Sequence, residues 1–377
     1  ESSARSVTRS VSDSALTSGK ARDHVTTNDM LEALRRLVEA ESYSGDPDGI
    51  EACGRAIDEL CGDLLGQACE PAGPHLMWKR QGDRPVLLLC HFDTVWPPGT
   101  LSAFPFRVEE GVARGPGTFD MKAGIVQCLW ALRSVDTGPV TVLFTADEEI
   151  GSPTSRPLIE EHARDARAAL VLEPASGSSV KVARKGVAQW RLDVTGRAAH
   201  AGLAPEEGIN AAVELAGQID RLQELARPDD GTTVTVTTMA GGSASNVVPE
   251  SAWCTIDARM WSVGEADRLA SELAKLEPAL PGARLAVTGG LGRAPLERDA
   301  TEALYGRLMR LGYEVGGAAV GGASDGNITG GLGTPTLDGL GAVGGGAHAR
   351  TEHVLVDEMP RRAEMVARLV EDLLSDG

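Results

Sequence analysis

The stretch PVLLLCHFDTV, residues 85–95, guides the interpretation of the whole chain. Its apolar part, 86–89, predicts a strand inside a parallel sheet, because strands covered on both faces are apolar throughout. This strand would carry His91 and Asp93 at its carboxyl end, where open α/β sheets bind ligands. Residues two apart point the same way in an extended segment, so His91 could bind a metal while Asp93 orients its other ring nitrogen. By itself, His-x-Asp fits an ordinary surface or core histidine equally well.

Composition narrows the class of protein. A chain of 377 residues is too long for one ordinary core, so we expect two domains. A composition with 42% hydrophobic and 24% charged residues is typical of a globular protein. The net charge of −18 disfavours nucleic acid and anionic membranes as partners. No apolar run approaches the ~18 residues of a membrane span. Six cysteines without a CxxC pair predict free thiols and a cytoplasmic location.

Two further apolar segments lead directly into acidic residues. They are VTVLFTA, residues 140–146, and the segment 168–172, and both predict buried strands. The metal-competent residues that follow them are Glu148, Glu149 and Glu173. Because parallel strands end at the same edge of a sheet, these carboxylates are expected to gather with His91 along one edge of a doubly wound sheet.

A glycine-rich segment supplies another carboxylate. GPGTFDMKAG, residues 115–124, places Asp120 at the entry of a helix predicted over 122–132. Its glycines also suggest a phosphate loop, but the spacing fits no nucleotide fingerprint and no GK[ST] follows. Further on, the loop GAVGGGAHARTEHV, residues 341–354, presents His348 among glycines, with Glu352 four residues later. A histidine presented in this way is more often functional than one in a helix or strand.

The middle of the chain has a different pattern. Its elements follow the order strand, helix, strand, strand, helix, strand, which predicts an inserted ferredoxin-like α+β domain. The predicted strands are 180–195, 232–239, 251–260 and 284–289, and the predicted helices are 207–226 and 264–279. We therefore predict a discontinuous catalytic domain over 27–184 and 294–377, an inserted domain over 185–293, and a disordered leader or processed end over 1–26. A final helix is predicted to start at Pro360.

Two histidines with at least three carboxylates are the inventory of a two-metal hydrolytic site. Imidazole and carboxylate ligands suit Zn²⁺ first, with Co²⁺ or Mn²⁺ as substitutes. Two ions about 3.5–4 Å apart would activate a bridging water and polarise a scissile carbonyl. The adjacent Glu148 and Glu149 give one carboxylate more than ligation needs, so one would be a ligand and the other the proton shuttle. The residues alone leave open which is which.

Six motifs together resemble a known family. They are HFDTV, GPGTFDMKAG, TADEEIG, VLEP, the segment around His200 and GGGAHARTEHV. In order and spacing, from about residue 27 to the end, they are similar to the M20 metallopeptidases, most closely the glutamate carboxypeptidase branch. The resemblance implies that Asp120 bridges two ions and precedes a non-proline cis peptide. The other implied roles are metal ligation by His91, Glu149, Glu173 and His348, general base catalysis by Glu148, and orientation of His91 by Asp93.

The resemblance also concerns the inserted domain and the substrate. It implies a homodimer formed through the inserted domain, with His200 reaching the other subunit's site to stabilise an oxyanion. The positions implied to bind a substrate carboxylate are Lys181, Asn246, Arg259 and Arg293, and bidentate pairing explains why arginine suits that task. Around VKVARKG, Arg184 or Lys185 could replace Lys181. The chain departs from the family pattern in a set of tryptophans that packing alone would explain: Trp96, Trp190, Trp253 and Trp261.

These observations predict a homodimeric dizinc exopeptidase that acts on short peptides or N-acyl amino acids and cleaves the amide next to a free carboxylate. An aminoacylase, a desuccinylase-like enzyme or a dipeptidase would use the same metals. A non-enzymatic metal or ligand-binding protein is a further alternative, although such a protein would not need the additional carboxylate of Glu148. The last alternative is a nucleotide-dependent enzyme that would bind phosphate through the loop GPGTFDMKAG.

Overall fold

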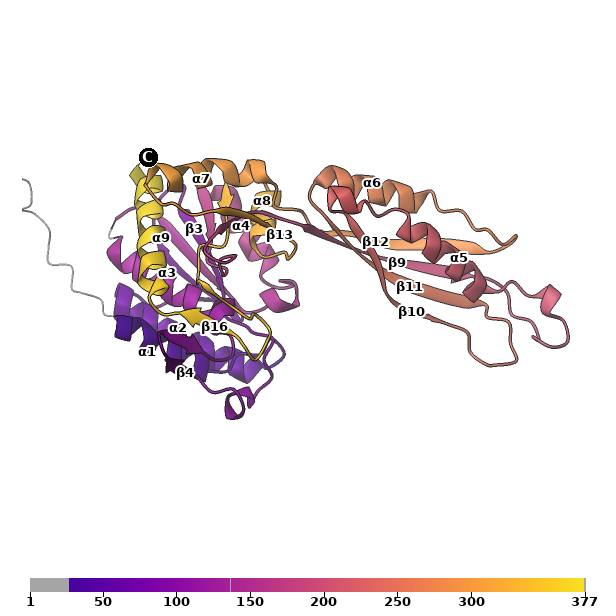
Figure 1. Ribbon diagram of the computed structural model, residues 1–377, viewed down its shortest axis with the longest axis horizontal. Helices are drawn as coiled ribbons and strands as arrows, with labels where there is room; N and C mark the ends of the chain where they lie inside the picture. Colours follow the sequence, from indigo (N-terminus) through magenta and orange to yellow (C-terminus); the bar gives the residue numbers. More distant parts are fainter. Residues whose placement is uncertain (1–26, 136, 376–377) are drawn as a thin grey trace, which may run out of the picture.

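The computed structural model describes residues 27–135 and 137–375 and shows two lobes, each built on its own sheet (Figure 1). The first lobe contains both the early and the late parts of the described chain, and the second lobe is formed by the segment between them. The predicted leader lies outside the described residues. Within the described ranges, every helix is too short or too polar for a bilayer span.

The first lobe is organised around a six-stranded sheet. In spatial order its strands are β1 (Glu70–Ala72), β2 (His75–Arg80), β6 (Val140–Thr145), β3 (Val86–His91), β7 (Ala168–Val171) and β14 (Thr336–Leu337). The last four are parallel to one another, whereas β2 runs antiparallel to both of its neighbours, β6 and β1. All of β3 is buried, which confirms the strand predicted at the start of PVLLLCHFDTV.

Helices cover both faces of this sheet (Figure 1). One face packs against α1 (Thr27–Glu39), α2 (Pro47–Leu65), α3 (Ala123–Ser134), α7 (Arg298–Arg310) and α9 (Glu358–Ser375), and the other against α4 (Arg156–Asp165) and α8 (Gly326–Gly331). Along β3, Leu88 and Cys90 belong to the first core and Leu89 to the second. The last helix begins two residues before the predicted start at Pro360, since proline is tolerated within the first turn.

Two small sheets shape the surroundings of the site. One pairs β8 (Val180–Arg184) with β13 (Gly317–Val320). The other joins β15 (Gly344–Gly345), β16 (His353–Leu355), β5 (Val112–Arg114) and β4 (Arg107–Glu109). Because β16 lies beside β5, the glycine-rich loop before it is brought onto the segment that leads to Asp120. These connections explain how residues more than 200 positions apart meet.

The second lobe is a complete α+β unit. Its antiparallel sheet has the order β10 (Thr233–Gly241), β11 (Ser251–Met260), β9 (Gly186–Thr195) and β12 (Arg284–Arg293). Helices α5 (Ala211–Gln223) and α6 (Val263–Ala274) share a core with one face of this sheet (Figure 1). The chain order and the strand order confirm the predicted ferredoxin-like fold. The overall fold class is therefore the one predicted.

One predicted strand is wrong. The sequence pattern indicated a single strand over 180–195, but the structure divides it into β8 and β9, separated by Lys185. The first piece pairs with β13 in the first lobe, and only the second piece enters the second sheet. The backbone N–H of Lys185 donates to the carbonyl of Val320. Both pieces are extended, so the periodicity of the sequence gave no sign of the change of partner.

Candidate metal centre and substrate site

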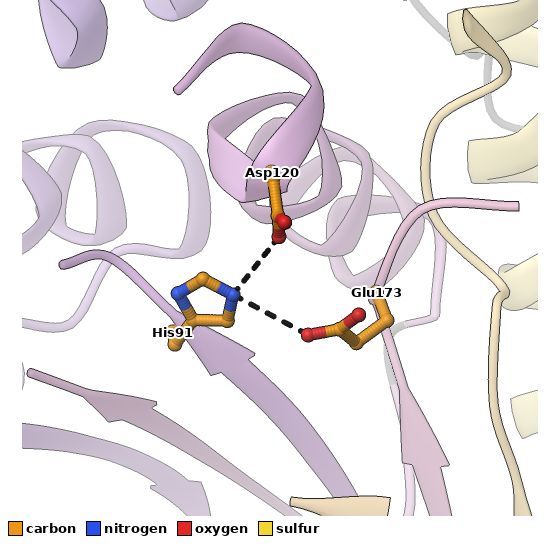
Figure 2. A group of neighbouring side chains, drawn as sticks. All are labelled: His91, Asp120 and Glu173. Carbon is orange, nitrogen blue, oxygen red and sulfur yellow. Dashed lines mark hydrogen bonds and ion pairs between the residues drawn. The ribbon is translucent and has the colours of Figure 1, made fainter. Parts of the chain in front are cut away.

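Two groups of metal-competent side chains share one carboxylate. His91 Nε2 lies 3.2 Å from Asp120 Oδ1 and 3.3 Å from Glu173 Oε1 (Figure 2). His348 Nε2 lies 3.3 Å from Asp120 Oδ2 and 3.2 Å from Glu149 Oε2. Within each group, the donor atoms all lie within 4.8 Å of one another. The two oxygens of Asp120 thus face different histidines, the arrangement that a bridging carboxylate requires.

The fold explains why these residues meet. His91 ends β3, Glu173 follows β7, and Glu149 lies in the short turn after β6, so neighbouring parallel strands deliver three donors to one edge. Asp120 precedes α3, and the Asp120–Met121 peptide bond is cis, as the resemblance implied. His348 comes from the glycine-rich loop and has a left-handed backbone with φ of 61°. The structure therefore brings together all five residues expected to bind metal.

The electrostatics of the site favour cations. Although burial favours the neutral ring, the surrounding carboxylates, Asp120 first, raise the pKa of His91 well above its usual value. Hydrogen bonds with Asp120 and Glu149 raise the pKa of His348 to about 10. In addition, Glu149 Oε1 is buried and has no hydrogen-bond partner among the described residues. Imidazole nitrogens and carboxylate oxygens that favour positive charge fit Zn²⁺, Co²⁺ or Mn²⁺ at both groups.

The adjacent glutamates occupy different environments. Glu149 faces His348, whereas Glu148 Oε1 accepts a hydrogen bond from Arg293 Nη1 at 2.7 Å. Burial raises the pKa of Glu148 to about 8, against the opposing effect of His91 and Arg293. A carboxylate with a pKa in this range is suited to exchange protons near neutral pH. The geometry thus favours Glu149 as a ligand and Glu148 as the proton-transfer group.

Asp93 connects the end of β3 to the turn that carries both glutamates. His91 Nδ1 lies 3.1 Å from the backbone carbonyl oxygen of Asp93, its hydrogen-bond partner, and 3.5 Å from Asp93 Oδ1. The Asp93 carboxylate also accepts hydrogen bonds from the backbone N–H groups of Glu148 and Glu149, at 3.1 and 3.2 Å, and from the Ser44 hydroxyl at 2.7 Å. Asp93 is completely buried. It therefore holds a histidine ligand and the glutamate turn in a fixed relation.

A cavity of about 810 Å³ lies over the metal-competent groups and is lined by both lobes. All three cations among the predicted substrate-binding residues, Lys181, Arg259 and Arg293, line it. Arg259 on β11 and Arg293 on β12 are both paired with Val187 on β9, the strand between them. The two arginines therefore lie in one row across the second sheet, on the face that α5 and α6 do not cover. Asp257 accepts two hydrogen bonds from Arg259, at 2.8 and 3.0 Å, and fixes the direction of its guanidinium.

The two alternatives to Lys181 differ in position. Arg184 is buried and donates to Glu173 Oε2 at 2.8 Å and to both carboxylate oxygens of Asp338. Although burial opposes it, the charge of Arg184 lowers the pKa of Glu173 well below its usual value. Arg184 thus supports a metal-competent carboxylate and also lines the cavity. Lys185 instead lies over the Trp261 ring, 5.2 Å from its centroid.

His200 and Asn246 lie elsewhere. His200 and Asn246 belong to two loops at the end of the second lobe that is farthest from the first lobe (Figure 1). These loops are in contact, because the Asn246 carbonyl accepts the N–H of Ala201. Within the described chain, the cavity lining does not include them. His200 Nδ1 accepts the N–H groups of Gly202 and Leu203, each at 3.2 Å. The ring proton of neutral His200 is therefore on Nε2, which can donate a hydrogen bond from this exposed residue.

Two buried carboxylates were not assigned a role from the sequence. Glu352 accepts the backbone N–H groups of Gly117, Phe119 and Asp120 at 2.9 to 3.0 Å, and the Trp96 indole N–H at 2.8 Å. It holds the turn that presents Asp120. Its place near His348 was visible in the sequence, but its partners lie 232 or more positions earlier.

Asp325 is the second such carboxylate. It accepts the Ser152 hydroxyl at 2.5 Å, and Ser152 accepts a hydrogen bond from Arg293 at 2.6 Å. Asp325 Oδ1 itself lies 3.6 Å from Arg293 Nη2. The pair therefore fixes the guanidinium that contacts Glu148. The only signal in the sequence was the short motif GGASDGN, residues 321–327.

The chain is similar to proteins of known families. The model of "Peptidase family M20/M25/M40" matches residues 87–372. Carboxypeptidase G2 of Pseudomonas sp. (strain RS-16) is 32% identical over 369 residues, which cover 91% of this chain and 89% of that protein. Succinyl-diaminopimelate desuccinylase of Dechloromonas aromatica is 27% identical over 394 residues, covering 92% and 98%. The crystal structure of aminopeptidase PepT from Bacillus cereus has a TM-score of 0.75 at 21% identity and covers 92% of this chain and 99% of that one.

Proposed function

The chain belongs to the M20 family of metallopeptidases, and on this premise we propose that it is a two-metal exopeptidase that cleaves an amide next to a free carboxylate. The proposal depends mainly on one observation: two groups of metal-competent donors share Asp120 in a cavity that cations also line. The carboxypeptidase activity is preferred to the related ones because the carboxypeptidase relative is 32% identical over 91% of the chain.

We propose that each group of donors holds one ion. His91 and Glu173 would hold one ion, and Glu149 and His348 would hold the other. Asp120 would contribute to holding both ions. Two Zn²⁺ ions, or Co²⁺ or Mn²⁺ in their place, would polarise the scissile carbonyl and make water a stronger nucleophile at neutral pH. Asp93 would keep the His91 ring oriented, because its backbone carbonyl lies 3.1 Å and its carboxylate 3.5 Å from Nδ1 of the ring.

Glu148 is proposed to move the proton. It would take a proton from the attacking water and give it to the nitrogen of the leaving amine. Arg293 holds Oε1 of Glu148, so Oε2 remains for the proton. Asp325 and Ser152 would position Glu148 indirectly, because they fix the guanidinium of Arg293.

The leaving amino acid would be recognised through its carboxylate. Lys181, Arg259 and Arg293 line the same cavity as the metal-competent groups, and the two arginines lie in one row of the second sheet. Charge-assisted hydrogen bonds from such side chains suit a carboxylate, and arginine can form two in parallel. Substrates would therefore be short peptides or N-acyl amino acids with a free carboxyl end.

We further propose that the protein acts as a homodimer joined through the second lobe. His200 and Asn246 lie at the far end of that lobe and expose groups that can donate hydrogen bonds. In a dimer each would serve the cavity of the partner subunit. His200 would donate from Nε2 to the oxygen that gains negative charge as the carbonyl is attacked.

A substrate panel tests the proposal. The purified protein, loaded with Zn²⁺ or Co²⁺, is incubated with N-acyl amino acids, N-blocked dipeptides and the same compounds with amidated carboxyl ends, and the products are identified by mass spectrometry. Cleavage is expected only where the carboxylate is free. The chain length and acyl group of the best substrate would separate a carboxypeptidase from an aminoacylase, a desuccinylase-like enzyme or a dipeptidase. Failure to cleave any carboxylate-bearing amide would refute the proposal.

A further inference from the structure

A second cavity, with a volume of about 550 Å³, adjoins the site and has no role in the proposed chemistry. It is built entirely by the first lobe, between α2, the β1–β2 hairpin and the segment 146–154. Its volume lies within the range of small-molecule sites. The apolar residues that give it its character are Ile50, Pro71, Pro74, Leu76, Ile150 and Pro153. We call it the apolar cavity.

The apolar cavity is a neighbour of the site cavity. Ile150 lines both, and it belongs to the same short turn as Glu148 and Glu149. Ser44, in the wall of the apolar cavity, donates a hydrogen bond to Asp93 behind the metal-competent His91. The apolar cavity therefore lies next to the turn that carries Glu148 and Glu149.

Charged residues at the apolar cavity are already paired. Arg55 donates to Glu51 one helical turn earlier, and Asp58 Oδ1 accepts the backbone N–H of Cys69 at 2.6 Å. A charged ligand group would have to compete with these contacts. The remaining wall offers apolar surface, which favours an uncharged, apolar occupant.

We propose that the apolar cavity receives the acyl half of the substrate and gives the enzyme a preference for bulky, uncharged, apolar acyl groups. This inference depends on the proposed function, because an amide substrate has two halves that leave the reacting carbonyl in different directions. Arg259 and Arg293 of the second lobe would bind the leaving half. The acyl half then requires a different surface, and the apolar cavity of the first lobe provides one next to the same turn.

Gly54 offers a way to fill the cavity. It lies within α2 in the cavity wall, and an added Cβ would meet Leu76 Cδ1 at 3.7 Å and Phe92 Cζ at 4.0 Å, which are ordinary contacts. The Gly54→Leu side chain should therefore fit the helix and occupy cavity space. Gly62 provides a matched control, because it is an exposed glycine of the same helix with nothing within 4 Å of an added Cβ.

The test compares two substrates that differ only in the acyl group, an N-(4-fluorobenzoyl) and an N-acetyl amino acid. For Gly54→Leu, the ratio of kcat/KM for the aroyl over the acetyl substrate should fall roughly tenfold, the size of effect typical for filling a specificity pocket. Gly62→Leu should leave the ratio unchanged. Gly54→Ala, which adds one methyl group, should lower the same ratio by a smaller factor. This variant can still decide the question if Gly54→Leu folds poorly.

Binding without turnover provides a second readout. The ¹⁹F signal of 4-fluorobenzamide alone should broaden with the unchanged protein and with Gly62→Leu, and should remain sharp with Gly54→Leu. An unchanged substrate ratio in folded Gly54→Leu, or undiminished broadening, would overturn the assignment of the cavity while the proposed function stood. If the unchanged protein hydrolysed neither substrate, the proposed function would fail first, and the acyl assignment with it.

Discussion

The two lobes contribute to the site in different ways. The first lobe gathers its metal-competent residues at one sheet edge, where His91 Nε2 lies 3.2 Å from Asp120 Oδ1 and 3.3 Å from Glu173 Oε1. The second lobe places Arg259 in the lining of the cavity, whereas His200 follows the opposite end of β9. From residue 187, in the row of Arg259, to residue 195 at the end of β9, eight steps of about 3.3 Å span roughly 26 Å.

This difference shows that one chain contains all the residues of the metal-competent centre. The residues of the second lobe that are proposed to contact the substrate, by contrast, lie at both of its ends. A side chain cannot bridge roughly 26 Å, so His200 can contribute to catalysis only through another subunit or a large rearrangement. Changes in the first lobe should therefore act within each chain. Changes at the far end of the second lobe should act between chains.

The largest expected effect comes from Glu148→Gln, in the first lobe. Removing the proton acceptor should lower kcat by about 10²- to 10⁴-fold, while metal content, measured by elemental analysis, stays at the level of the unchanged protein. Metal should be retained because the two donor groups do not include Glu148. Glu161→Gln, at an exposed position of α4, is the matched control and should keep full activity. Undiminished turnover in Glu148→Gln would eliminate this residue as the base.

His200→Ala tests the far end of the second lobe. Loss of one oxyanion donor should lower kcat by about 10²- to 10³-fold. Mixing this variant with Glu148→Gln should restore up to about a quarter of the activity, since half of randomly exchanged dimers are hybrids with one complete site each. His162→Ala, on α4, should have no effect. If subunit exchange is verified and activity does not return, His200 does not act between subunits.

Asp93→Asn returns to the first lobe and tests how its ligands are held. The amide would place an NH₂ group where the carboxylate now accepts hydrogen bonds from Ser44 and from the turn of Glu148. Metal affinity of the group around His91 should fall roughly 10- to 100-fold, measured by titration in metal buffers. Asp267→Asn, an exposed change in α6, is the control. Unaltered affinity in Asp93→Asn would show that the His91 ring needs no such support.

The contrast between the lobes also explains what the sequence could predict. His91 ends a buried strand, and Glu149 and Glu173 each follow one, so a local pattern and the direction of parallel strands suffice to group them. Glu352 has partners 232 or more positions away, and no local pattern encodes such a pairing. The change of sheet at Lys185 escaped detection for a similar reason, because β8 and β9 are both extended and differ only in their distant partners.

The near end of the second lobe should give the smallest effect. Arg259→Gln removes one cation from a row that also contains Arg293, and about a third of the Arg259 side chain is exposed, so solvent weakens its interactions. KM for carboxylate substrates should rise roughly tenfold, which is the scale of one charge-assisted hydrogen bond, with little change in kcat. Arg298→Gln, an exposed arginine paired with Glu302, should leave KM unchanged. A fall in kcat at constant KM would instead place Arg259 in the chemical step. The proposal that the first lobe carries out the chemistry while the second lobe binds the substrate carboxylate would then be wrong.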